Sequence, residues 1–223
     1  MSKHAPRPHQ RRLATAVGAA LLGTVALGTS VAEALPGPLA DGLVSAQYAA
    51  TQAASPVVLP VEWQQQTKGY NCGPAATRIA LSALVRRDRL PSQQQLGVDE
   101  GTSPDTGTYR TGMAAGLNKY TPSVRWEPST GDIWTGVTAA INKKRPLPIA
   151  IEIGSRSELP PGWSAGKVGV QHWFTAIGYN PATHEVKVAD PASKFSGFNS
   201  NPEYWISLTT LRAIHVAHIR PTA

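Results

Sequence analysis

The spacing of apolar positions changes near the middle of the chain, from a helical repeat to short apolar runs. Between residues 72 and 88, "CGPAATRIALSALVRRD", apolar side chains recur every three or four residues, at Ala76, Ile79, Ala80, Ala83 and Leu84. This spacing places them on one face of a helix. Pro74 suits the first helical turn, where its missing N–H needs no partner. The pattern therefore predicts a helix over 72–88 that begins at Cys72.

Further helices are expected after this one. In "PSQQQLG", Ser92 and Gln95 have the spacing of a capping box, which predicts a short helix after Ser92. Residues 108–120 follow a helical pattern that glycines interrupt. Residues 130–145 carry apolar side chains at helical spacing, and Thr130 is expected to cap them.

From residue 147 onward the pattern is typical of strands. The segments "QHWFTAIGYN" (171–180) and "EVKVAD" (185–190) flank a turn, which predicts a β-hairpin. Further strands are expected at 58–63, 147–153, 204–208 and 215–220. Since helices come first and strands second, we predict an α+β domain over 58–223. Its N-terminal helical part would pack on a C-terminal, mostly antiparallel sheet.

The residues before this domain have the pattern of an export signal. Residues 3–12 are basic, residues 13–30 are uncharged and apolar, and Ala32 and Ala34 have the small-x-small spacing of a cleavage site. This order predicts a secretory signal peptide over 1–34. A membrane anchor is disfavoured because the stretch is short and rich in glycine and alanine. Arg11-Arg12 permits a twin-arginine route, but the residues that follow match it weakly.

Residues 35–57 are rich in alanine, serine, glycine and proline, and we interpret them as a linker or a short pro-segment. Removing 34 of the 223 residues leaves 189, enough for one domain. The removed segment holds four basic residues and one acidic residue, so the formal net charge falls from +7 to +4. The basic runs at 85–89 and 142–145 follow helices and contain no aromatic residues, which disfavours nucleic acid as a partner. We expect a secreted protein without stable membrane insertion.

Cys72 is the only cysteine of the chain, so it cannot form an internal disulfide. Such a thiol is either a small buried hydrophobic group or a reactive one. At a helix start, the sulfur would face unpaired backbone N–H groups and the positive end of the helix dipole. This environment stabilises the thiolate, which is the nucleophilic form. Cys72 is therefore a candidate nucleophile.

Three other residues could complete a site around Cys72. Gln66 lies six residues earlier, and its amide could join the Cys72 backbone N–H in holding an oxyanion. His172 begins one strand of the predicted hairpin and Asp190 ends the other, so both lie at the same open end. A carboxylate there can hold the imidazole by one nitrogen and leave the other facing the sulfur. Alternatively, His172 is a core histidine and Asp190 a turn former before proline.

Four features of the chain, taken together, resemble the papain-like cysteine peptidases: Gln66, the "CGPA" at 72–75, "HWFTAIGY" and "VADPA". The likeness is strongest to the bacteriocin-processing (double-glycine) peptidase superfamily and its secreted bacterial relatives, and it covers residues 58–210. The resemblance implies a papain-like fold, with Cys72 as nucleophile and His172 as general base and acid. It also implies that Asp190 orients His172 and that Gln66 supplies the oxyanion hole.

The expected function is that of an exported cysteine hydrolase, which cleaves a peptide or isopeptide bond of a peptide or protein substrate through a thioester on Cys72. A transglutaminase-like acyltransferase would use the same residues and stays open. A non-catalytic secreted binding module, in which Cys72 only packs, also stays open.

No cofactor or metal is expected. His215 and His218 are spaced like metal ligands, but no acid or cysteine accompanies them. As strand residues three apart they are expected to point to opposite faces, so we interpret them as structural. Three tryptophans are expected either to wall a groove around the site or to fill the core, namely Trp63, Trp163 and Trp173.

Overall fold

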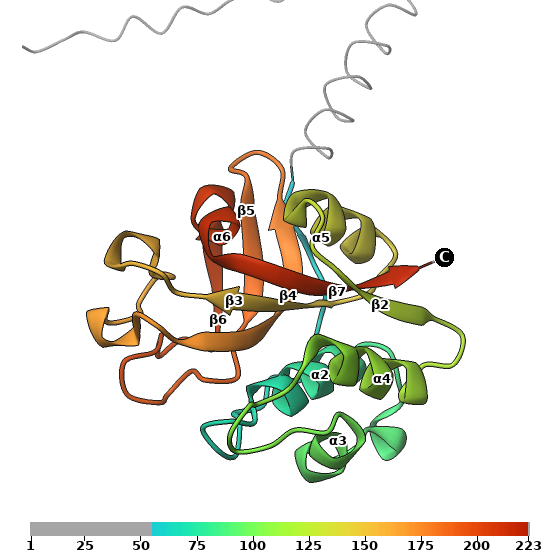
Figure 1. Cartoon of the computed structure of the whole chain (residues 1–223). Helices are drawn as coiled ribbons and strands as arrows, with labels where there is room; N and C mark the ends of the chain where they lie inside the picture. The colour runs from blue at the N-terminus through green and yellow to red at the C-terminus, as the bar shows by residue number, and fades with distance from the viewer. Residues whose placement is uncertain (1–54, 223) are drawn as a thin grey trace, which may run out of the picture. The chain divides into compact units, whose positions relative to one another are not determined.

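The computed structural model describes residues 55–222, and the predicted signal peptide lies outside them. Within this range, α2–α4 form one helical layer on a curved antiparallel sheet, and α5 and α6 lie on the other side (Figure 1). This arrangement confirms the predicted α+β class, with the helical part early in the chain and the sheet later. No helix in residues 55–222 is long and apolar enough to cross a membrane.

The helical layer consists of α2 (Cys72–Ser82), α3 (Gln93–Asp99) and α4 (Arg110–Tyr120), with a short 3-10 turn at Arg87–Arg89. Helix α2 begins at Cys72 as predicted but ends six residues earlier than the predicted 88. The Ser82 hydroxyl donates to the Ile79 carbonyl, and Ala83 and Leu84 donate to carbonyls three residues back. Such local bonds compete with the α-helical ladder and end the helix there.

The sheet has the strand order β2-β7-β3-β4-β5-β6, and β1 also pairs with β4. The predicted hairpin is present as β4 and β5, joined at Asn180 opposite Glu185. Of the expected strand 58–63, only Val58 lies in a strand, which begins one residue earlier at Val57. The strands are β1 (Val57–Val58), β2 (Arg125–Ser129), β3 (Leu147–Glu152), β4 (Gln171–Asn180), β5 (Glu185–Ala189), β6 (Glu203–Ser207) and β7 (His215–Thr222).

Two apolar clusters stabilise the layers on either side of the sheet. Strand alternation sends Phe174 of β4 into the cluster with α5 (Ile133–Asn142) and α6 (Leu208–Ile214). It sends the neighbouring Trp173 into the cluster with α2, α3 and α4, which also contains Cys72. Each fully buried large side chain contributes on the order of 2 kcal/mol. The nucleophile candidate therefore belongs to the core that joins the helical layer to the sheet.

Several local predictions were wrong for identifiable reasons. Asp132 rather than Thr130 caps α5, because its carboxylate accepts the Thr135 backbone N–H. Ser92 caps α3 as predicted, but Gln95 does not return the bond of a capping box and donates to Asp99 instead.

His215 and His218 do not point to opposite faces of β7. A register shift against β3 between Ala150 and Ile151 inserts an extra residue, Val216, into β7. This bulge turns both rings to one side, with His215 Nε2 at 3.1 Å from His218 Nδ1. Within residues 55–222 these rings belong to no group of three or more possible metal ligands.

Candidate active site

The start of α2 holds Cys72 where backbone donors are unpaired. Asn71 precedes the helix and makes no side-chain capping bond. The first backbone N–H groups of α2 therefore have no hydrogen-bond acceptor within the helix itself. The sulfur accepts hydrogen bonds from the backbone N–H groups of Gly73 and, across the layer boundary, Trp173. Cys72 is 8% exposed and forms no disulfide. These contacts place the thiol at the floor of a cleft, in reach of a small reactant.

His172 lies in β4 and connects Cys72 to Asp190. Its Nε2 lies 2.8 Å from Asp190 Oδ1, and both side chains are buried. The imidazole also forms a side-chain hydrogen bond with Cys72. Because Nε2 is occupied by the carboxylate, Nδ1 is the nitrogen that faces the sulfur. The structure thus brings three of the four predicted site residues into one chain of contacts.

Asp190 is fixed on all sides. Its Oδ1 also accepts the Ala192 backbone N–H at 2.9 Å, and its Oδ2 accepts the Tyr204 hydroxyl at 2.9 Å. Tyr204 in turn accepts a hydrogen bond from Trp163 Nε1 at 3.1 Å. A buried carboxylate held by this many donors cannot turn away from His172.

Tyr204 was not predicted as a site residue. The sequence identifies a strand at 204–208 but not the partner that its inward hydroxyl meets. The only available signal was a tyrosine, rather than a phenylalanine, at an inward strand position, because a buried hydroxyl requires a partner.

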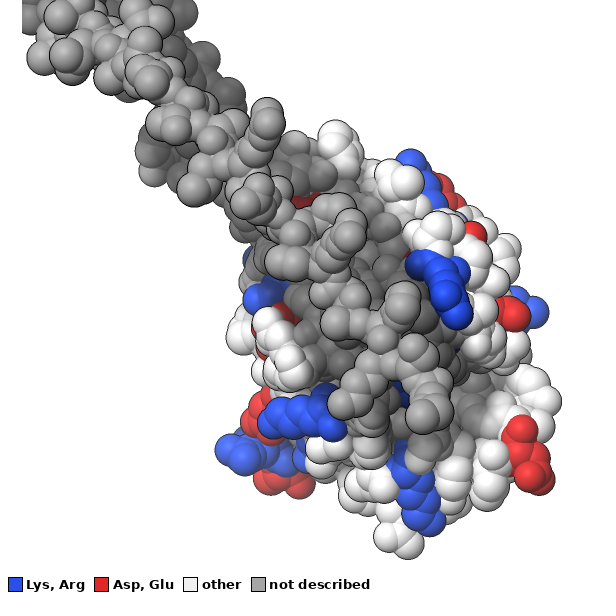
Figure 2. Space-filling model, turned by 90° about the vertical axis from the view of Figure 1, so that its left-hand side faces the viewer, with Lys and Arg blue, Asp and Glu red and all other residues white. Residues whose placement is uncertain are grey.

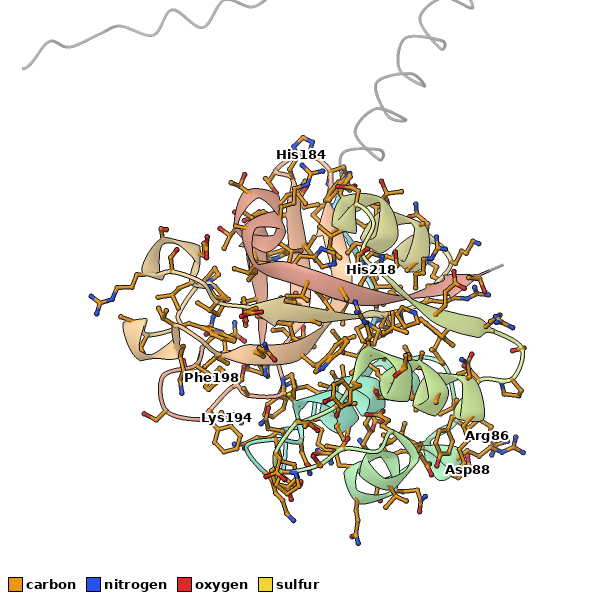
Figure 3. The ribbon with its side chains drawn as sticks, in the orientation of Figure 1. Arg86, Asp88, His184, Lys194, Phe198 and His218 are labelled. Atoms are coloured by element: carbon orange, nitrogen blue, oxygen red, sulfur yellow. The ribbon has the colours of Figure 1, made fainter. Side chains whose placement is uncertain are left out.

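Aromatic side chains cover the far side of the imidazole. Trp163 packs edge-on against His172, with ring centroids 5.5 Å apart, and Phe198 lies 5.7 Å away at a tilt. Lys167 lies over the Phe198 ring. Phe198 projects from the loop between β5 and β6 (Figure 3). This cover shields the hydrogen bond between His172 and Asp190 from water.

The three tryptophans of the sequence prediction have different roles. Trp163 covers His172. Trp63 donates from Nε1 to the Asp190 carbonyl at 2.8 Å. Trp173 lines the cleft, and its Nε1 donates to the Thr108 carbonyl at 3.0 Å.

The surroundings of Cys72 and His172 favour the charged form of both side chains. Burial raises the pKa of the Cys72 thiol, but the hydrogen bond and charge of His172 and two backbone N–H groups outweigh it, so the pKa lies below the ordinary 9.0. Burial lowers the pKa of His172, but the charge and hydrogen bond of Asp190, together with Cys72, raise it from 6.5 to about 9. At neutral pH the arrangement therefore stabilises a thiolate beside an imidazolium.

A cleft of about 250 Å³ opens over Cys72 and His172. One wall is the segment 106–110 of the helical layer, and the other comes from β3, β4 and β7. Exposed Tyr109 and Val216 lie on its rim. On the face drawn in Figure 2, the visible basic and acidic side chains are interspersed.

Gln66 lies beside Pro191, which follows Asp190, but its side chain is turned toward its own loop. Its backbone N–H donates to the Pro191 carbonyl, and its side chain is buried. The amide Nε2 donates to the carbonyls of Lys68 and Gly69 at 2.9 and 3.2 Å. The Oε1 atom is buried and has no hydrogen-bond partner within residues 55–222. In this orientation the amide protons are engaged by the loop 66–69.

A helix-borne thiol and an imidazole from an antiparallel sheet, buried at the boundary between the two layers, define the papain-like class of cysteine peptidase folds. A sequence model described as the Peptidase_C39 like family matches residues 58–210, and the chain belongs to this family. This membership confirms the predicted relationship to the bacteriocin-processing peptidases.

A solved cysteine protease structure supports the fold. Xylellain, a cysteine protease from Xylella fastidiosa, matches with a TM-score of 0.53 at 10% identity, over 75% of this chain and 86% of its own. A double glycine motif protease from an AMS/PCAT transporter, in complex with the leader peptide, matches at 16% identity with a TM-score of 0.48. That match covers 75% of this chain and 98% of the other. No curated protein matches the chain.

Proposed function

We propose that this protein is a cysteine peptidase that hydrolyses a peptide or isopeptide bond through a thioester on Cys72. The observation that carries the proposal is the buried His172 ring, held by Asp190 through one nitrogen and bonded to Cys72 through the other. A buried histidine with a purely structural role needs only hydrogen-bond partners for its two ring nitrogens. Here the same contacts also raise the pKa of the imidazole and lower that of the thiol, as a nucleophile and its acid require.

The proposed reaction begins with attack of the Cys72 thiolate on the scissile carbonyl carbon. A carbon–sulfur bond forms and the carbonyl oxygen becomes an oxyanion. As the carbon–nitrogen bond breaks, the Nδ1–H of His172 protonates the leaving amine, which leaves a thioester and a neutral imidazole. His172 then takes a proton from water, whose oxygen attacks the thioester and releases the acid and the thiolate. Asp190 holds the ring by Nε2 throughout and stabilises the imidazolium.

We assign the oxyanion hole to the Cys72 backbone N–H and the Gln66 amide. The unpartnered Oε1 of Gln66 supports this, because a side chain with its oxygen and nitrogen exchanged would present amide protons at that position. The exchanged orientation would also lose two hydrogen bonds, since the amide oxygen would then face the carbonyl oxygens of Lys68 and Gly69. Removal of the amide distinguishes the two arrangements.

The reaction is tested on the mature protein with a peptide library and mass readout. We expect cleavage that disappears in Cys72→Ala and His172→Ala. Iodoacetamide should alkylate Cys72 faster than a model thiol at neutral pH. A wild-type protein that cleaves no peptide and alkylates at the rate of a model thiol would leave a binding module as the function.

Hydrolysis and acyl transfer differ only in the acceptor, water or a primary amine. Adding a primary amine to the cleavage reaction separates them, since a transferase would form the amide in preference to the free acid.

We also propose that the protein is exported and that its signal peptide is cleaved after Ala34. The mass and N-terminal residue of the protein recovered outside the cell would test both, with Leu35 as the expected first residue.

A further inference from the structure

A second ionisable side chain is buried near Cys72 without a role in the reaction above. Glu100 follows α3 and is 4% exposed. Neither of its carboxyl oxygens has a well-aligned hydrogen-bond partner within residues 55–222. No basic side chain forms an ion pair with it in that part of the chain. A charged carboxylate in such surroundings is strongly unfavourable, so the group is held as the neutral acid.

The surrounding helices leave Glu100 little room to move. A Cβ at Gly112 would lie 2.0 Å from the Glu100 carbonyl oxygen, and a Cβ at Gly116 would lie 2.8 Å from its Cγ. Both glycines of α4, which only weakened the helical pattern in the sequence, thus serve the close approach of Glu100. From α2, Thr77 faces the carboxyl with a buried hydroxyl that also lacks a well-aligned partner.

The charged groups that act on Glu100 come from two helices. From α2, the Cys72 thiolate repels the carboxylate; from α3, the neighbouring Asp99 does the same. Asp99 is itself held by Lys119 and Tyr120 of α4 at 2.7 Å each, so those donors do not neutralise Glu100. Burial first, and then Cys72 and Asp99, raise the pKa of Glu100 from 4.5 to about 8, although Thr77 lowers it in part.

We infer that Glu100 is a proton-dependent positioning residue for Cys72: as a neutral acid it closes the packing of α2, α3 and α4 behind the nucleophile, and its ionisation opposes both that packing and the Cys72 thiolate. The coupling to the thiolate rests on the proposed role of Cys72. A glutamine would fill the same space with no dependence on pH. The acid therefore makes the helical layer tighter in acidic solution and looser in alkaline solution.

The sign follows from proton linkage. A carboxyl whose pKa is higher in the folded than in the unfolded protein binds more protons when folded, so its contribution to stability is lost as pH rises. The loss begins near the unfolded value of 4.5 and is complete near 8. Over that interval Glu100 should lower the folding equilibrium constant by roughly 10³-fold relative to a glutamine.

The test measures urea unfolding between pH 4.5 and 9 in four proteins: the wild type, Glu100→Gln, Cys72→Ser, and the double variant. Subtracting each Glu100→Gln partner removes the titration of every other group. With Cys72 present, the difference should grow by roughly 10³-fold in the equilibrium constant up to pH 8. With Cys72→Ser it should level off at a lower pH, because the thiolate charge is gone.

Two results would overturn the inference. A difference that does not change with pH would mean that Glu100 does not titrate in the folded protein. A difference that is the same with and without Cys72 would mean that the two groups are not coupled. Neither measurement requires peptidase activity, so an inactive wild type that still shows the coupling would overturn the proposed function alone.

Two further variants keep the test decisive. Asp132→Asn is the matched control: Asp132 is a carboxylate with a lowered pKa that is not among the groups acting on Glu100, so this variant should not reproduce the change between pH 4.5 and 8. Should Glu100→Gln not fold, Thr77→Val provides a second route. It removes the hydroxyl that lowers the pKa of Glu100, so the loss of stability should extend to higher pH than in the wild type. An unchanged profile in Thr77→Val would then count against the inference.

Discussion

The substitution Asp190→Asn should separate catalysis from fold at this site. Asp190 is fully buried and accepts hydrogen bonds from His172, Ala192 and Tyr204. An asparagine has the same shape, but it is neutral and has one acceptor oxygen instead of two. The change removes the charge that favours the His172 imidazolium, while the surrounding backbone can stay in place.

The magnitude follows from the pKa of His172. Burial alone would lower that pKa below 6.5, and Asp190 is the first of the groups that raise it to about 9. A rise from 6.5 to 9 corresponds to about 3 kcal/mol in favour of the imidazolium. Without the carboxylate, the pKa of His172 should fall, so less of the imidazole is protonated at pH 7.5 and the thiolate loses part of its counter-ion. We expect kcat/KM to fall by roughly 10²- to 10³-fold at that pH.

The assay is kcat/KM on a cleaved peptide as a function of pH. In the wild type, activity should rise at a pH below 9.0, where the Cys72 thiolate forms, and fall near 9, where His172 loses its proton. In Asp190→Asn the falling limb should move to lower pH. Asp132→Asn, which removes an exposed capping carboxylate far from Cys72 in sequence, is the control and should keep the wild-type profile. A variant with wild-type kcat/KM and an unmoved alkaline limb would refute the role of Asp190.

Three other substitutions test neighbouring parts of the site. Tyr204→Phe removes one donor to Asp190 and should lower kcat/KM by roughly tenfold and the free energy of unfolding by about 1–2 kcal/mol, measured by peptide cleavage and urea unfolding. Gln66→Ala should reduce kcat by roughly 10²-fold with little change in KM if the amide holds the oxyanion; an equal kcat would remove Gln66 from the mechanism. Gly73→Ala places a Cβ 2.2 Å from Thr108 Oγ1, so it should destabilise the fold by about 1–3 kcal/mol and slow alkylation of Cys72, as read by thermal unfolding and iodoacetamide kinetics.

The strong periodic patterns of the sequence predicted most of the fold correctly. The helix starting at Cys72, the 171–190 hairpin and the order of helices before strands follow from apolar spacing and turn residues, because burial of one face imposes that spacing. The weak elements were missed: β2 contains Pro128, and α6 is a seven-residue helix placed directly between β6 and β7. Short elements like these are fixed by tertiary contacts rather than by a repeat of their own.

The candidate site was predictable only in part. Hairpin pairing was enough to place His172 and Asp190 at one end, since strand register fixes which residues meet. The contacts of Tyr204 and Glu100 were not predictable, because both side chains act through burial and through partners distant in sequence. The β7 bulge that brings His215 and His218 together likewise has no signal in the sequence.

The geometry of the site depends on how one helix is docked on one strand. Cys72 and His172 belong to different layers, and the buried bond from the Thr175 hydroxyl to the Ala76 carbonyl, 2.8 Å long, joins those layers. Thr175 lies three residues after His172 and Ala76 lies four residues after Cys72, so this bond fixes α2 against β4 about one turn from the reacting atoms. The Trp173 backbone N–H, which donates to the sulfur, fixes the same boundary from within the site. In the proposed mechanism the thiol and the imidazole exchange a proton only within hydrogen-bonding distance, so any loosening of the helical layer should act on the reaction before the protein unfolds. A titrating group within that layer, such as Glu100, is therefore well placed to control the nucleophile without contacting the substrate.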